Sequence, residues 1–591
     1  MRRASLALAA LAALTVSSCS EPAGLEVTID VGDFKDNSML RVILTVTGGF
    51  KPHPREVVEN RVTVYSPPGE DSLVIELPRP AKTETFRVTT GNKAALTVTG
   101  EARVFDDTQL LANGTNTAPL PIGGDGSLKI TVAAYQGPVV SPKMRSTDLL
   151  ATPADVTVKG TSAQSKSLAV CDFNKDGFDD IAVGVPSAKY LDLTTGGVYV
   201  AFGDGTGSAF ELGKGTEFHF LSNESDAKLG AAVACADLNK DGFGDLIVGA
   251  PGAGKGTGKV YVVYGRLNLA QTTIDLTNAS KQPDIQWTTA TAGAALGSAL
   301  FAVSAEGTDP NVILASAPGA SLVHMFANVV PTPTPIDADK PDHATFAGVK
   351  AGALGAGRFI NKTGAYDIVL GDPEFRAATS AYKTGVVYAF AAVPPASTTA
   401  YSVAADAASG PALAMVGARD SQFGAAVLAL DTTGRGDDLF VGAPGGGANG
   451  EGQVFIYEHD DALFVLKDRP YTDNTKVLTG YVASGQFGRA LARTGSGTAP
   501  SVTWRLLVGA PGARRGDDRP LAGAAYMFGS DVRRDFPILE EVFGGAGGDL
   551  LGTAVAGGQI NDDLTGDLVT LAEGAAGTMP GAGAVYVKYG Q

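Results

Sequence analysis

The chain has 591 residues, which exceeds the length of one ordinary domain and predicts a small domain followed by a large one. Its 62 acidic and 46 basic residues give a net charge of −16, which disfavours nucleic acid as a partner because phosphate binding relies on clustered Lys and Arg. There are 76 glycines and only 18% charged residues, so the composition predicts many tight turns between short strands.

The first 18 residues are predicted to be an export signal. Arg2 and Arg3 precede an apolar run of about 13 residues, and small residues stand just before Cys19. The run is shorter than the roughly 20 residues that a spanning helix needs, and no later segment is long enough, so no transmembrane helix is expected. An ordinary secretory signal with an incidental cysteine is one interpretation.

The tetrapeptide from Val16 to Cys19 also resembles the lipobox of bacterial lipoproteins, whose cysteine is acylated and becomes the new N-terminus. This resemblance implies a signal peptide over 1–18, a lipidated anchor over 19–24 with lipid on Cys19, and a place in the bacterial cell envelope. Ser20 does not match the inner-membrane retention signal, so the outer membrane is favoured, with the protein facing either the periplasm or the surface.

Residues 25–136 are predicted to form an antiparallel β-sandwich of immunoglobulin-like type. Short runs of alternating apolar and polar residues are separated by turn sequences such as TGG, PPGE and GGDG. Seven runs in about 110 residues suit two packed sheets, although no Cys…Trp…Cys pattern is present and the topology stays open. The runs lie at 25–31, 40–46, 60–65, 72–77, 84–90, 95–105 and 127–135. The polar segment 137–153, with two prolines and no strong period, is predicted to be a linker.

One pattern then recurs seven times between residue 154 and residue 591. Each copy has an FG-like pair leading into a short apolar strand, a polar loop, a run like IVGAP, a Gly-rich turn and a strand like VYVVYG; the clearest copy covers 229–265. The spacing of 55 to 71 residues is too long for a solenoid coil and suits a four-stranded unit. The GAP proline recurs at Pro186, Pro251, Pro318, Pro373, Pro444 and Pro511.

These copies resemble FG-GAP repeats, the units of the integrin α-chain β-propeller and of many bacterial surface proteins. The resemblance implies an all-β fold with seven four-stranded blades around a central channel. Tandem independent sandwiches are the alternative, but a unit of about 65 residues would leave both faces of its single sheet bare. The last copy ends with its third strand, so ADVTVKG at 154–160 is expected to complete that blade and close the ring.

Two polar loops carry acidic residues at the spacing of calcium ligands. Calcium takes six to eight oxygen ligands, and a glycine at position 6 allows the sharp turn that brings them together. Lys175 and Lys240, at even positions, are expected to point outward. The predicted ligands at positions 1, 3, 5, 7 and 9 are Asp172, Asn174, Asp176, the Phe178 carbonyl and Asp180 in the first loop, and Asp237, Asn239, Asp241, the Phe243 carbonyl and Asp245 in the second.

An EF-hand is excluded because Val183 and Val248 stand at position 12, where Glu is required, and because the flanks read as strands. The loops instead resemble the strand-loop-strand calcium cages of FG-GAP repeats, which implies two well-formed structural sites. Asn/Asp-rich turns that bind nothing are the alternative. The other five copies are degenerate, and turns held by hydrogen bonds are expected there, with weak metal binding conceivable at Asp431 or Asp563.

The two cysteines beyond Cys19 are expected to be buried free thiols, with a disulfide as the alternative. Cys171 lies one residue before its loop and Cys235 lies two residues before, so on extended strands their side chains should point to opposite faces.

Three further motifs carry no predicted chemistry. The run GAGKGTGKV at 252–260 departs from the P-loop pattern at Ala253 and Val260, so it is interpreted as a Gly-rich turn between strands. Arg-Gly-Asp at 435–437 and 515–517 is interpreted as coincidence. The five histidines lack zinc-ligand spacing.

The sequence therefore predicts a lipid-anchored, calcium-binding envelope protein that binds an envelope or extracellular protein or a polysaccharide, and that is not an enzyme. By resemblance, partners would engage the face opposite the calcium loops. Two alternatives are a structural subunit of an envelope assembly and a polysaccharide-degrading enzyme on a propeller scaffold. The turns expected on the binding face are 186–196, 251–258, 373–384, 444–452 and 511–523.

Overall fold

The chain folds into two compact units, which are described separately. The first comprises Met1–Pro153 and Phe536–Glu540, and the second comprises Ala154–Asp535 and Glu541–Gln591. Within the described residues no helix has both the length and the apolar character to cross a membrane. The computed structural model describes residues 24–590 except 32–38, 48–56, 60–61, 66–71, 79, 81, 90–95, 106–109, 121–125, 135–139, 161–164, 204–209, 212–217, 270–271, 305–310, 328–334, 341–342, 361–364, 378–381, 395–397, 405–408, 432–435, 460–475, 496–503, 516–518, 530–537, 562–565 and 577–581.

The first unit contains two β-sheets that share one apolar core. One sheet has the order β6 (Thr83–Thr89), β1 (Gly24–Asp30), β9 (Gly126–Thr131). The other has the order β10 (Ala133–Ala134), β8 (Leu110–Leu120), β7 (Leu96–Phe105), β2 (Met39–Thr47), β5 (Ser72–Pro78), β4 (Val62–Tyr65), β3 (Val57–Glu59). Alternate residues of β1 and β2, such as Val27 and Val42, meet in the core, because successive side chains of a strand point to opposite faces.

Each of the seven predicted runs of this unit contains a strand, and the two sheets share one core, as expected of a β-sandwich. The unit is not wholly antiparallel as predicted, because β1 and β9 pair in parallel. Its immunoglobulin-like topology stays a prediction. Strand β8 was not predicted, because LLANGTNTAPL has no clear apolar alternation and contains Asn, Gly and Pro, which are depleted in strands. Its long antiparallel pairing with β7 supplies what its composition does not.

The predicted linker is not irregular throughout, because it contains strand β11 (Val140–Asp148). This strand is hydrogen-bonded to β42, whose first residues belong to the same unit. Pro142 lies within it, which suits an edge strand since proline donates no backbone hydrogen bond.

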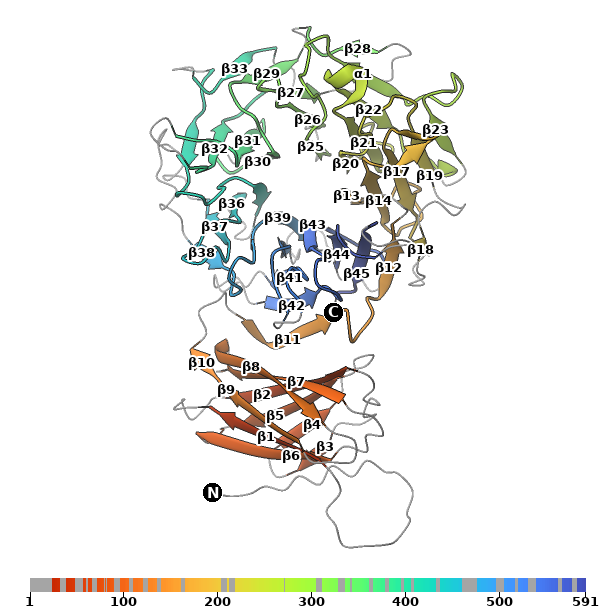
Figure 1. Ribbon diagram of the computed structural model, residues 1–591. Helices are drawn as coiled ribbons and strands as arrows, with labels where there is room; N and C mark the ends of the chain where they lie inside the picture. The colour runs from red at the N-terminus through yellow and green to blue at the C-terminus, as the bar shows by residue number, and fades with distance from the viewer. Residues whose placement is uncertain are drawn as a thin grey trace, which may run out of the picture. The chain divides into compact units, whose positions relative to one another are not determined.

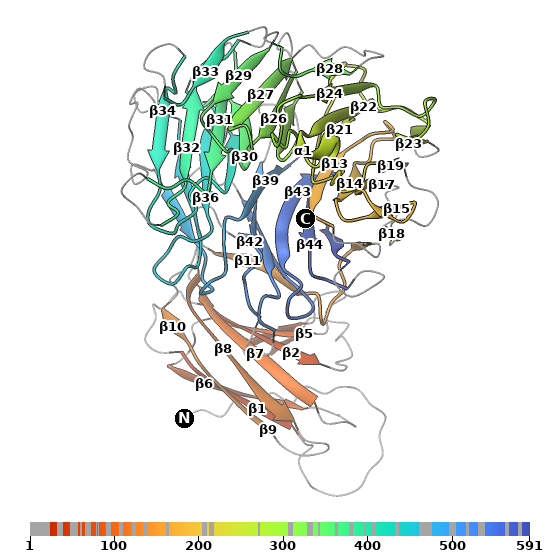
Figure 2. The same cartoon turned by 45° about the horizontal axis from the view of Figure 1, so that its top comes forward.

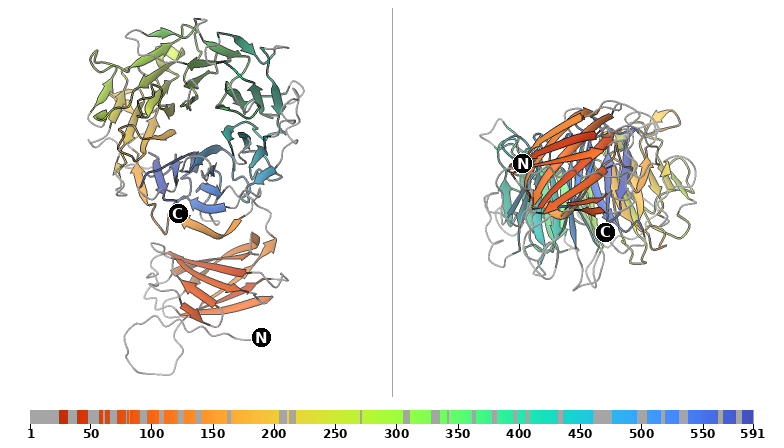
Figure 3. Two further views of the ribbon diagram at one scale, coloured as in Figure 1. Left: turned by 180° about the vertical axis from the view of Figure 1, so that it is seen from behind. Right: turned by 90° about the horizontal axis from the view of Figure 1, so that it is seen from below.

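In the part of the chain that the structure describes, the second unit contains seven β-sheets of four or five strands that follow one another along the chain and stand in a ring (Figures 1 and 3). Each is built on four antiparallel strands, named here from the first strand of the blade to the fourth. A short parallel fifth strand is added to some blades. The first three blades have a fifth strand: blade 1 is β13 (Ser167–Cys171), β14 (Asp180–Val185), β17 (Gly197–Ala201), β19 (Phe218–Leu221) and β23 (Thr273–Asp275); blade 2 is β20 (Ala232–Ala236), β21 (Asp245–Ala250), β22 (Lys259–Val263), β24 (Ile285–Thr288) and β28 (Ile336–Asp337); blade 3 is β25 (Leu300–Val303), β26 (Val312–Ala317), β27 (Leu322–Ala327), β29 (Ala344–Ala347) and β33 (Ala400–Ser402). The next two have four strands: blade 4 is β30 (Ala353–Gly357), β31 (Asp367–Asp372), β32 (Val386–Phe390) and β34 (Leu413–Val416); blade 5 is β35 (Ala426–Leu430), β36 (Asp438–Ala443), β37 (Gln453–Tyr457) and β38 (Lys476–Thr479). Blade 6 is β39 (Ala490–Thr494), β40 (Arg505–Ala510), β41 (Ala524–Gly529) and β42 (Ile538–Phe543), and blade 7 is β43 (Leu551–Gly558), β44 (Asp567–Ala572), β45 (Ala584–Lys588) and β12 (Val156–Lys159), with β18 (Phe210–Glu211) as its fifth strand.

The first strands of successive blades lie side by side around the ring, and β43 of the last blade lies against β13 of the first. Figure 2, in which the molecule is tilted, shows the same succession of sheets. A closed circle of radially arranged four-stranded sheets is a β-propeller. The small ribbon β15 (Lys189–Tyr190) and β16 (Leu193–Thr194) and the single-turn helix α1 (Ala253–Gly256) connect second and third strands.

The second strand of each blade explains the repeated apolar run of the sequence. In β14 and β21 all six residues are buried, although strands with one wet face would alternate. Each blade is covered by a neighbour on both sides, so both faces of its central strands must be apolar. The runs IAVGV and LIVGA are therefore continuous because of the ring and not because of the single sheet.

The two glycines that mark the repeat touch each other across neighbouring blades. Gly230, from the FG-like pair of the second blade, has φ +82°, and its carbonyl oxygen lies 2.1 Å from where a Cβ on Gly184 of the first blade would stand. Real Cβ atoms do not approach an oxygen this closely, so both positions require glycine. Equivalent approaches, all between 2.0 and 2.2 Å, join Gly249 with Gly297, Gly371 with Gly424, Gly442 with Gly488, and Gly509 with Gly552.

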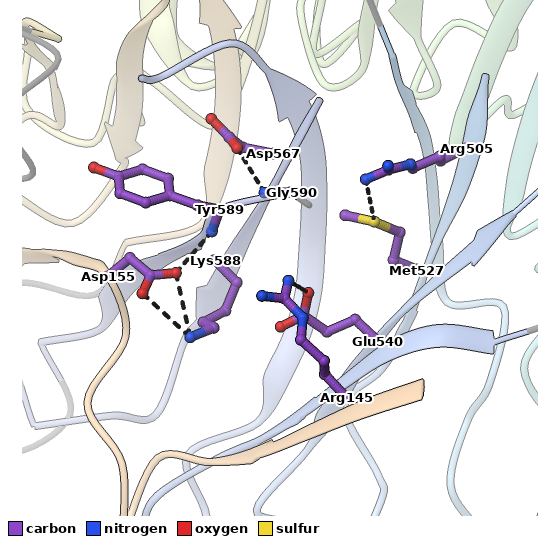
Figure 4. A network of polar contacts seen from close by, with 9 residues as sticks. All are labelled: Arg145, Asp155, Arg505, Met527, Glu540, Asp567, Lys588, Tyr589 and Gly590. Carbon is purple, nitrogen blue, oxygen red and sulfur yellow. Dashed lines mark hydrogen bonds and ion pairs between the residues drawn. The ribbon is translucent and has the colours of Figure 1, made fainter. Parts of the chain in front are cut away.

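Strand β12 closes the ring, as the sequence predicted. It pairs antiparallel with β45, with Val156 opposite Val587 and Lys159 opposite Ala584. Figure 4 shows the ion pair beside this junction, in which the Lys588 Nζ lies 3.2 Å from an Asp155 carboxylate oxygen. The same carboxylate accepts the Tyr589 N–H at 2.7 Å. The last blade is thus completed by a strand that precedes the first.

Candidate metal-binding loops

Both predicted metal loops connect the first and second strands of their blades. The first runs from β13 to β14 and the second from β20 to β21. At position 4, Lys175 and Lys240 have φ of 60° and 62°, and at position 6, Gly177 and Gly242 have φ of 96° and 85°. Two left-handed residues so close together turn the chain sharply, and the glycine relieves the strain at one of them.

In the first loop the predicted ligands are brought together by hydrogen bonds. Asp172 Oδ2 accepts the Gly177 N–H at 2.9 Å, and Asn174 Oδ1 accepts the Asp176 N–H at 3.0 Å. Asp176 Oδ1 in turn accepts the Phe178 N–H at 2.9 Å, and its other oxygen accepts the Asn174 amide at 2.8 Å. Three of the predicted ligands therefore form one compact turn.

The second loop repeats this arrangement. Asp237 Oδ2 accepts the Gly242 N–H at 2.9 Å, Asn239 Oδ1 accepts the Asp241 N–H at 3.0 Å, and Asp241 Oδ1 accepts the Phe243 N–H at 2.9 Å. The duplicated spacing in the sequence thus gives a duplicated local structure.

The aspartate at position 9 has a role that the sequence did not reveal. Asp180 is fully buried, and its two oxygens accept the N–H groups of Phe173 and Gly203, both at 2.9 Å. Gly203 lies two residues beyond the third strand β17, so the carboxylate fastens the loop to the end of that strand. Asp245 does the same with Leu238 at 2.7 Å and Gly265 at 2.9 Å.

This fastening also occurs in blades whose loops have lost the calcium-ligand spacing. Asp367 and Asp567 are fully buried and each accepts one N–H from the loop and one from beyond the third strand. Asp438 is fully buried as well and accepts the His459 N–H at 2.7 Å. In these blades, the aspartate that begins the second strand therefore has a structural role even where the calcium-ligand spacing is lost.

Burial disfavours a charge on these carboxylates. It raises the pKa of Asp180 to about 8, with smaller upward contributions from the charges of Asp176 and Asp172, while the N–H groups of Gly203 and Phe173 lower it. For the same reasons, with Asp241 and Asp237 as the neighbouring charges, the pKa of Asp245 rises to about 7. A cation bound in either loop would favour the charged form of its carboxylates.

The donor set fits a hard cation, although the carboxylates are turned toward their own backbone. Carboxylate, amide and carbonyl oxygens are what calcium and magnesium prefer, and each oxygen has a further lone pair. Among the residues that the structure describes, no three His, Cys, Asp or Glu side chains form a group that could hold a metal ion. The calcium cage therefore stays a prediction. Of the two weak candidates, Asp431 is half-buried beside the undescribed segment 432–435, and Asp563 lies outside the described residues, as does Cys19.

The two cysteines form a disulfide, so the expectation of free thiols is wrong. Cys171 and Cys235 lie on the first strands of adjacent blades, with their Cα atoms 6.4 Å apart. Pointing to opposite faces of their own sheets is what lets them meet, because neighbouring blades face each other with opposite faces. The argument from alternation was right about direction but assumed a shared sheet.

The expectation that Lys175 points outward is also incomplete. This side chain is exposed, but its Nζ donates to the Asp241 carbonyl of the second loop at 2.7 Å and lies 5.1 Å from the centre of the Phe243 ring. In addition, the Gly244 N–H donates to the Asp172 carbonyl at 2.7 Å. The two loops are thus in direct contact.

Other sequence motifs behave as predicted or fall outside the description. The Gly-rich run at 252–260 forms a turn between β21 and β22, and the Arg-Gly-Asp triplets include undescribed residues. The histidines held one surprise: His324 Nδ1 and His343 Nε2 are 3.0 Å apart and buried. Their separation of 19 residues carries no recognisable signal, because β27 and β29 are neighbours only through the sheet pairing.

Comparison with known proteins supports the reading of the repeats. A family model described as "FG-GAP repeat" matches residues 166–201 and 229–263. The phosphatidylinositol-glycan-specific phospholipase D of Rattus norvegicus is 32% identical over 161 residues, which are 26% of this chain and 18% of that protein. Integrin alpha pat-2 of Caenorhabditis elegans is 40% identical over 113 residues, 17% of this chain and 9% of that protein. Integrin alpha-7 of Homo sapiens is 39% identical over 107 residues, 18% of this chain and 8% of that protein.

The chain therefore spans less than a fifth of the length of each of these relatives. A solved structure titled "Structure of Dos1 propeller" aligns with 84% of this chain and 76% of that chain, at 10% identity and a TM-score of 0.25. The propeller assignment rests on the strand order of the seven sheets and not on this likeness.

Proposed function

Since the chain carries FG-GAP repeats in a β-propeller, we propose that it binds a protein or glycan partner without catalysis. In this proposal the protein binds calcium and is anchored by lipid in the bacterial cell envelope, with the outer membrane favoured. The partner is an envelope or extracellular protein or a polysaccharide, and it engages the face opposite the metal loops.

Strand direction determines on which face of the propeller each connection between strands lies. Because neighbouring strands in a blade are antiparallel, the connections between first and second strands lie on one face of the ring, and those between second and third strands lie on the other. The metal loops are of the first kind. The turns after the GAP proline, including 186–196 and 511–523, are of the second kind.

The observation that carries the proposal is the distribution of exposed apolar side chains. Among the described residues of the propeller, six large hydrophobic side chains are exposed. Leu267 belongs to the face of the metal loops, since it connects a third strand to a fourth. The other five belong to the opposite face: Leu191, Leu193, Tyr382, Val416 and Leu521. Apolar groups concentrated on one face favour a binding surface there.

Part of this face is also preorganised. The Arg419 guanidinium stacks 3.2 Å from the centre of the exposed Tyr382 ring. Aromatic and arginine side chains are enriched at binding surfaces, because they bring a large contact area with little loss of conformational freedom. The opposite face thus offers both apolar and cationic contacts.

Calcium binding is supported by the two loops of matching structure and by their buried carboxylates. Asp172, Asn174, Asp176 and Asp180, with the Phe178 carbonyl, would hold the ion in the first loop, and the corresponding residues from Asp237 to Asp245 would hold it in the second. A calcium ion there supplies positive charge between strands and takes no part in bond making or breaking. Lipid anchoring rests on the lipobox-like sequence at Cys19, and replacing Cys19 by alanine is expected to abolish incorporation of a labelled fatty acid.

The experiment that tests the binding face uses crosslinking in intact cells. The variant Leu191→Ser/Leu193→Ser/Tyr382→Ser removes apolar contacts from the opposite face, and Leu267→Ser is the matched control, since Leu267 is 74% exposed on the face of the metal loops. Loss of the crosslinked partner only in the triple variant supports the proposal. Equal recovery of the partner from both variants contradicts it.

The same crosslinking separates adhesion from a structural role, because a subunit of an envelope assembly would give one neighbour in fixed stoichiometry. Catalysis has a separate test. The phospholipase D relative is matched over only 18% of its length, so its activity does not transfer to this chain. Turnover of a phosphatidylinositol-glycan or of any polysaccharide in a screen would contradict the non-catalytic proposal.

A further inference from the structure

We propose that the disulfide between Cys171 and Cys235, together with Lys175, locks the two metal loops into one unit, so that cation binding at each loop depends on the other and on the thiol state. This inference rests on the proposed calcium function and adds to it a pair of positioning elements. They act on the ligands through the backbone and do not contact the ion.

The disulfide stands at the base of both loops. Cys171 is the last residue of β13 and is followed directly by Asp172, while Cys235 lies in β20 two residues before Asp237. Both cysteines are half-buried, so a small reagent can reach them. The crosslink therefore fixes the first ligand of one loop relative to the first ligand of the other.

Four further contacts join the first loop to the second blade. Lys175 binds the Asp241 carbonyl and lies against the Phe243 ring, and Phe243 offers the predicted carbonyl ligand of the second loop. The Gly244 N–H donates to the Asp172 carbonyl, and the Arg266 N–H donates to the Phe173 carbonyl at 3.1 Å. Positions 1 and 4 of the first loop thus support the second loop, and position 2 supports the segment that follows β22 of the same blade.

Little space remains for the loops to move independently while the disulfide is intact. A Cβ on Gly244 would lie 2.7 Å from the Cys171 Cβ, so the backbone of the second loop runs directly over the disulfide. Ligands held in place before the ion arrives bind it more tightly, since less ordering is needed on binding. Opening the disulfide removes that restraint from both loops at once.

The chemical step is a thiol–disulfide exchange with a dithiol reductant. One thiolate of the dithiol attacks one cysteine sulfur, the S–S bond breaks, and the other cysteine leaves as a thiolate that takes up a proton. The second thiol of the reagent then displaces the first cysteine. The disulfide gains two electrons and two protons, and the dithiol is oxidised to a cyclic disulfide.

Calcium titration by calorimetry tests this proposal on the full mature chain. Wild type is compared before and after reduction with dithiothreitol, and with Cys171→Ala/Cys235→Ala. Both opened forms are expected to bind calcium about fivefold or more weakly at both loops, within the usual range of coupling between sites. Tryptophan fluorescence of Trp287 and Trp504, both in the propeller, checks that it remains folded.

Coupling is measured with the second loop disabled by Asp241→Asn. The first loop should then bind calcium more weakly than in wild type, and this difference should shrink after reduction. Lys175→Met is expected to weaken the second loop severalfold, Lys175→Arg to restore much of the affinity, and Lys166→Met, a matched surface control, to change nothing.

The outcomes separate the two proposals. Absence of any calcium heat in the oxidised wild type overturns the proposed calcium function, and this inference with it. Two calcium sites with the same constants in oxidised, reduced and Lys175→Met protein overturn the coupling alone and leave calcium binding in place.

Discussion

Replacing Val158 by alanine tests whether strand β12 holds the propeller closed. Val158 is fully buried opposite Val585, in the core that joins the last blade to the first. The substitution leaves the backbone pairing of β12 with β45 intact and removes only two methyl groups. It therefore isolates the packing contribution of the closing strand.

The magnitude follows from the buried volume. Two buried carbons lose about 1.6 kcal/mol of transfer free energy, and the cavity left behind raises the destabilisation to about 2 to 3 kcal/mol. An unfolding entropy near 2.1 cal/mol/K per residue over the roughly 430 residues of the second unit gives about 0.9 kcal/mol/K. The melting temperature should therefore fall by about 2 to 3 °C.

Tryptophan fluorescence is the appropriate assay, because both tryptophans of the chain, Trp287 and Trp504, lie in the propeller and none lies in the first unit. The control is Thr157→Ala, on the same strand but only half-buried. Deleting residues 154–160 should lower the melting temperature further and affect the whole propeller. A single transition at the wild-type temperature in both the Val158 variant and the deletion would refute closure by β12.

Three further predictions follow from the contacts of the propeller. Replacing Gly184 by alanine should lower the free energy of unfolding, measured by urea denaturation, by about 2 kcal/mol or more, because the new Cβ would stand 2.1 Å from the Gly230 carbonyl oxygen. Wild-type stability of this variant would show that the two blades can move apart without cost and would contradict the prediction. Asp367→Asn should destabilise the propeller by about 1 to 3 kcal/mol, because two buried hydrogen bonds are perturbed, and should not change the number of calcium ions bound. Asp180→Asn, in contrast, should reduce the number of bound calcium ions by one. An equal number of bound ions in the two variants would contradict the assignment of Asp180 as a calcium ligand. Burial and the charge of His343 lower the pKa of His324 to about 4, with Asp339 partly opposing them, so below pH 6.5 the unfolded chain binds one more proton at this group. The His324 contribution to stability, measured as the difference between wild type and His324→Gln, should be constant above pH 6.5 and fall by roughly 3 kcal/mol as the pH drops to 4. A difference that does not change with pH would count against this prediction.

Much of the fold was accessible from the sequence because repetition averages out local ambiguity. One copy such as 229–265 shows a run like LIVGA that suits either a buried strand or a helix segment. Seven copies with the same turns at similar spacing fix the four-stranded unit, and the missing last strand predicts the closure by 154–160. Strand β11 escaped prediction because its pairing with β42, and not its composition, makes it a strand.

In the candidate site, too, contacts between residues close in sequence could be predicted, and contacts between distant residues could not. The predicted ligands from Asp172 to Asp180 are close in sequence, so spacing alone predicts that they share one turn. The second role of Asp180, fastening the loop to Gly203, depends on a residue 23 positions away and was not visible. The same holds for the pair His324 and His343, which only the pairing of β27 with β29 brings together.

The sequence by itself determined the repeat, the strand order within a blade and the local form of the metal loops, because hydrogen bonds and burial within one blade follow from residues near each other in the chain. Only the tertiary structure decided which residues of neighbouring blades contact one another. Their opposite faces meet, so Cys171 and Cys235 bond although alternation sends them apart, and Lys175 reaches into the second loop although it sits on the exposed side of its own.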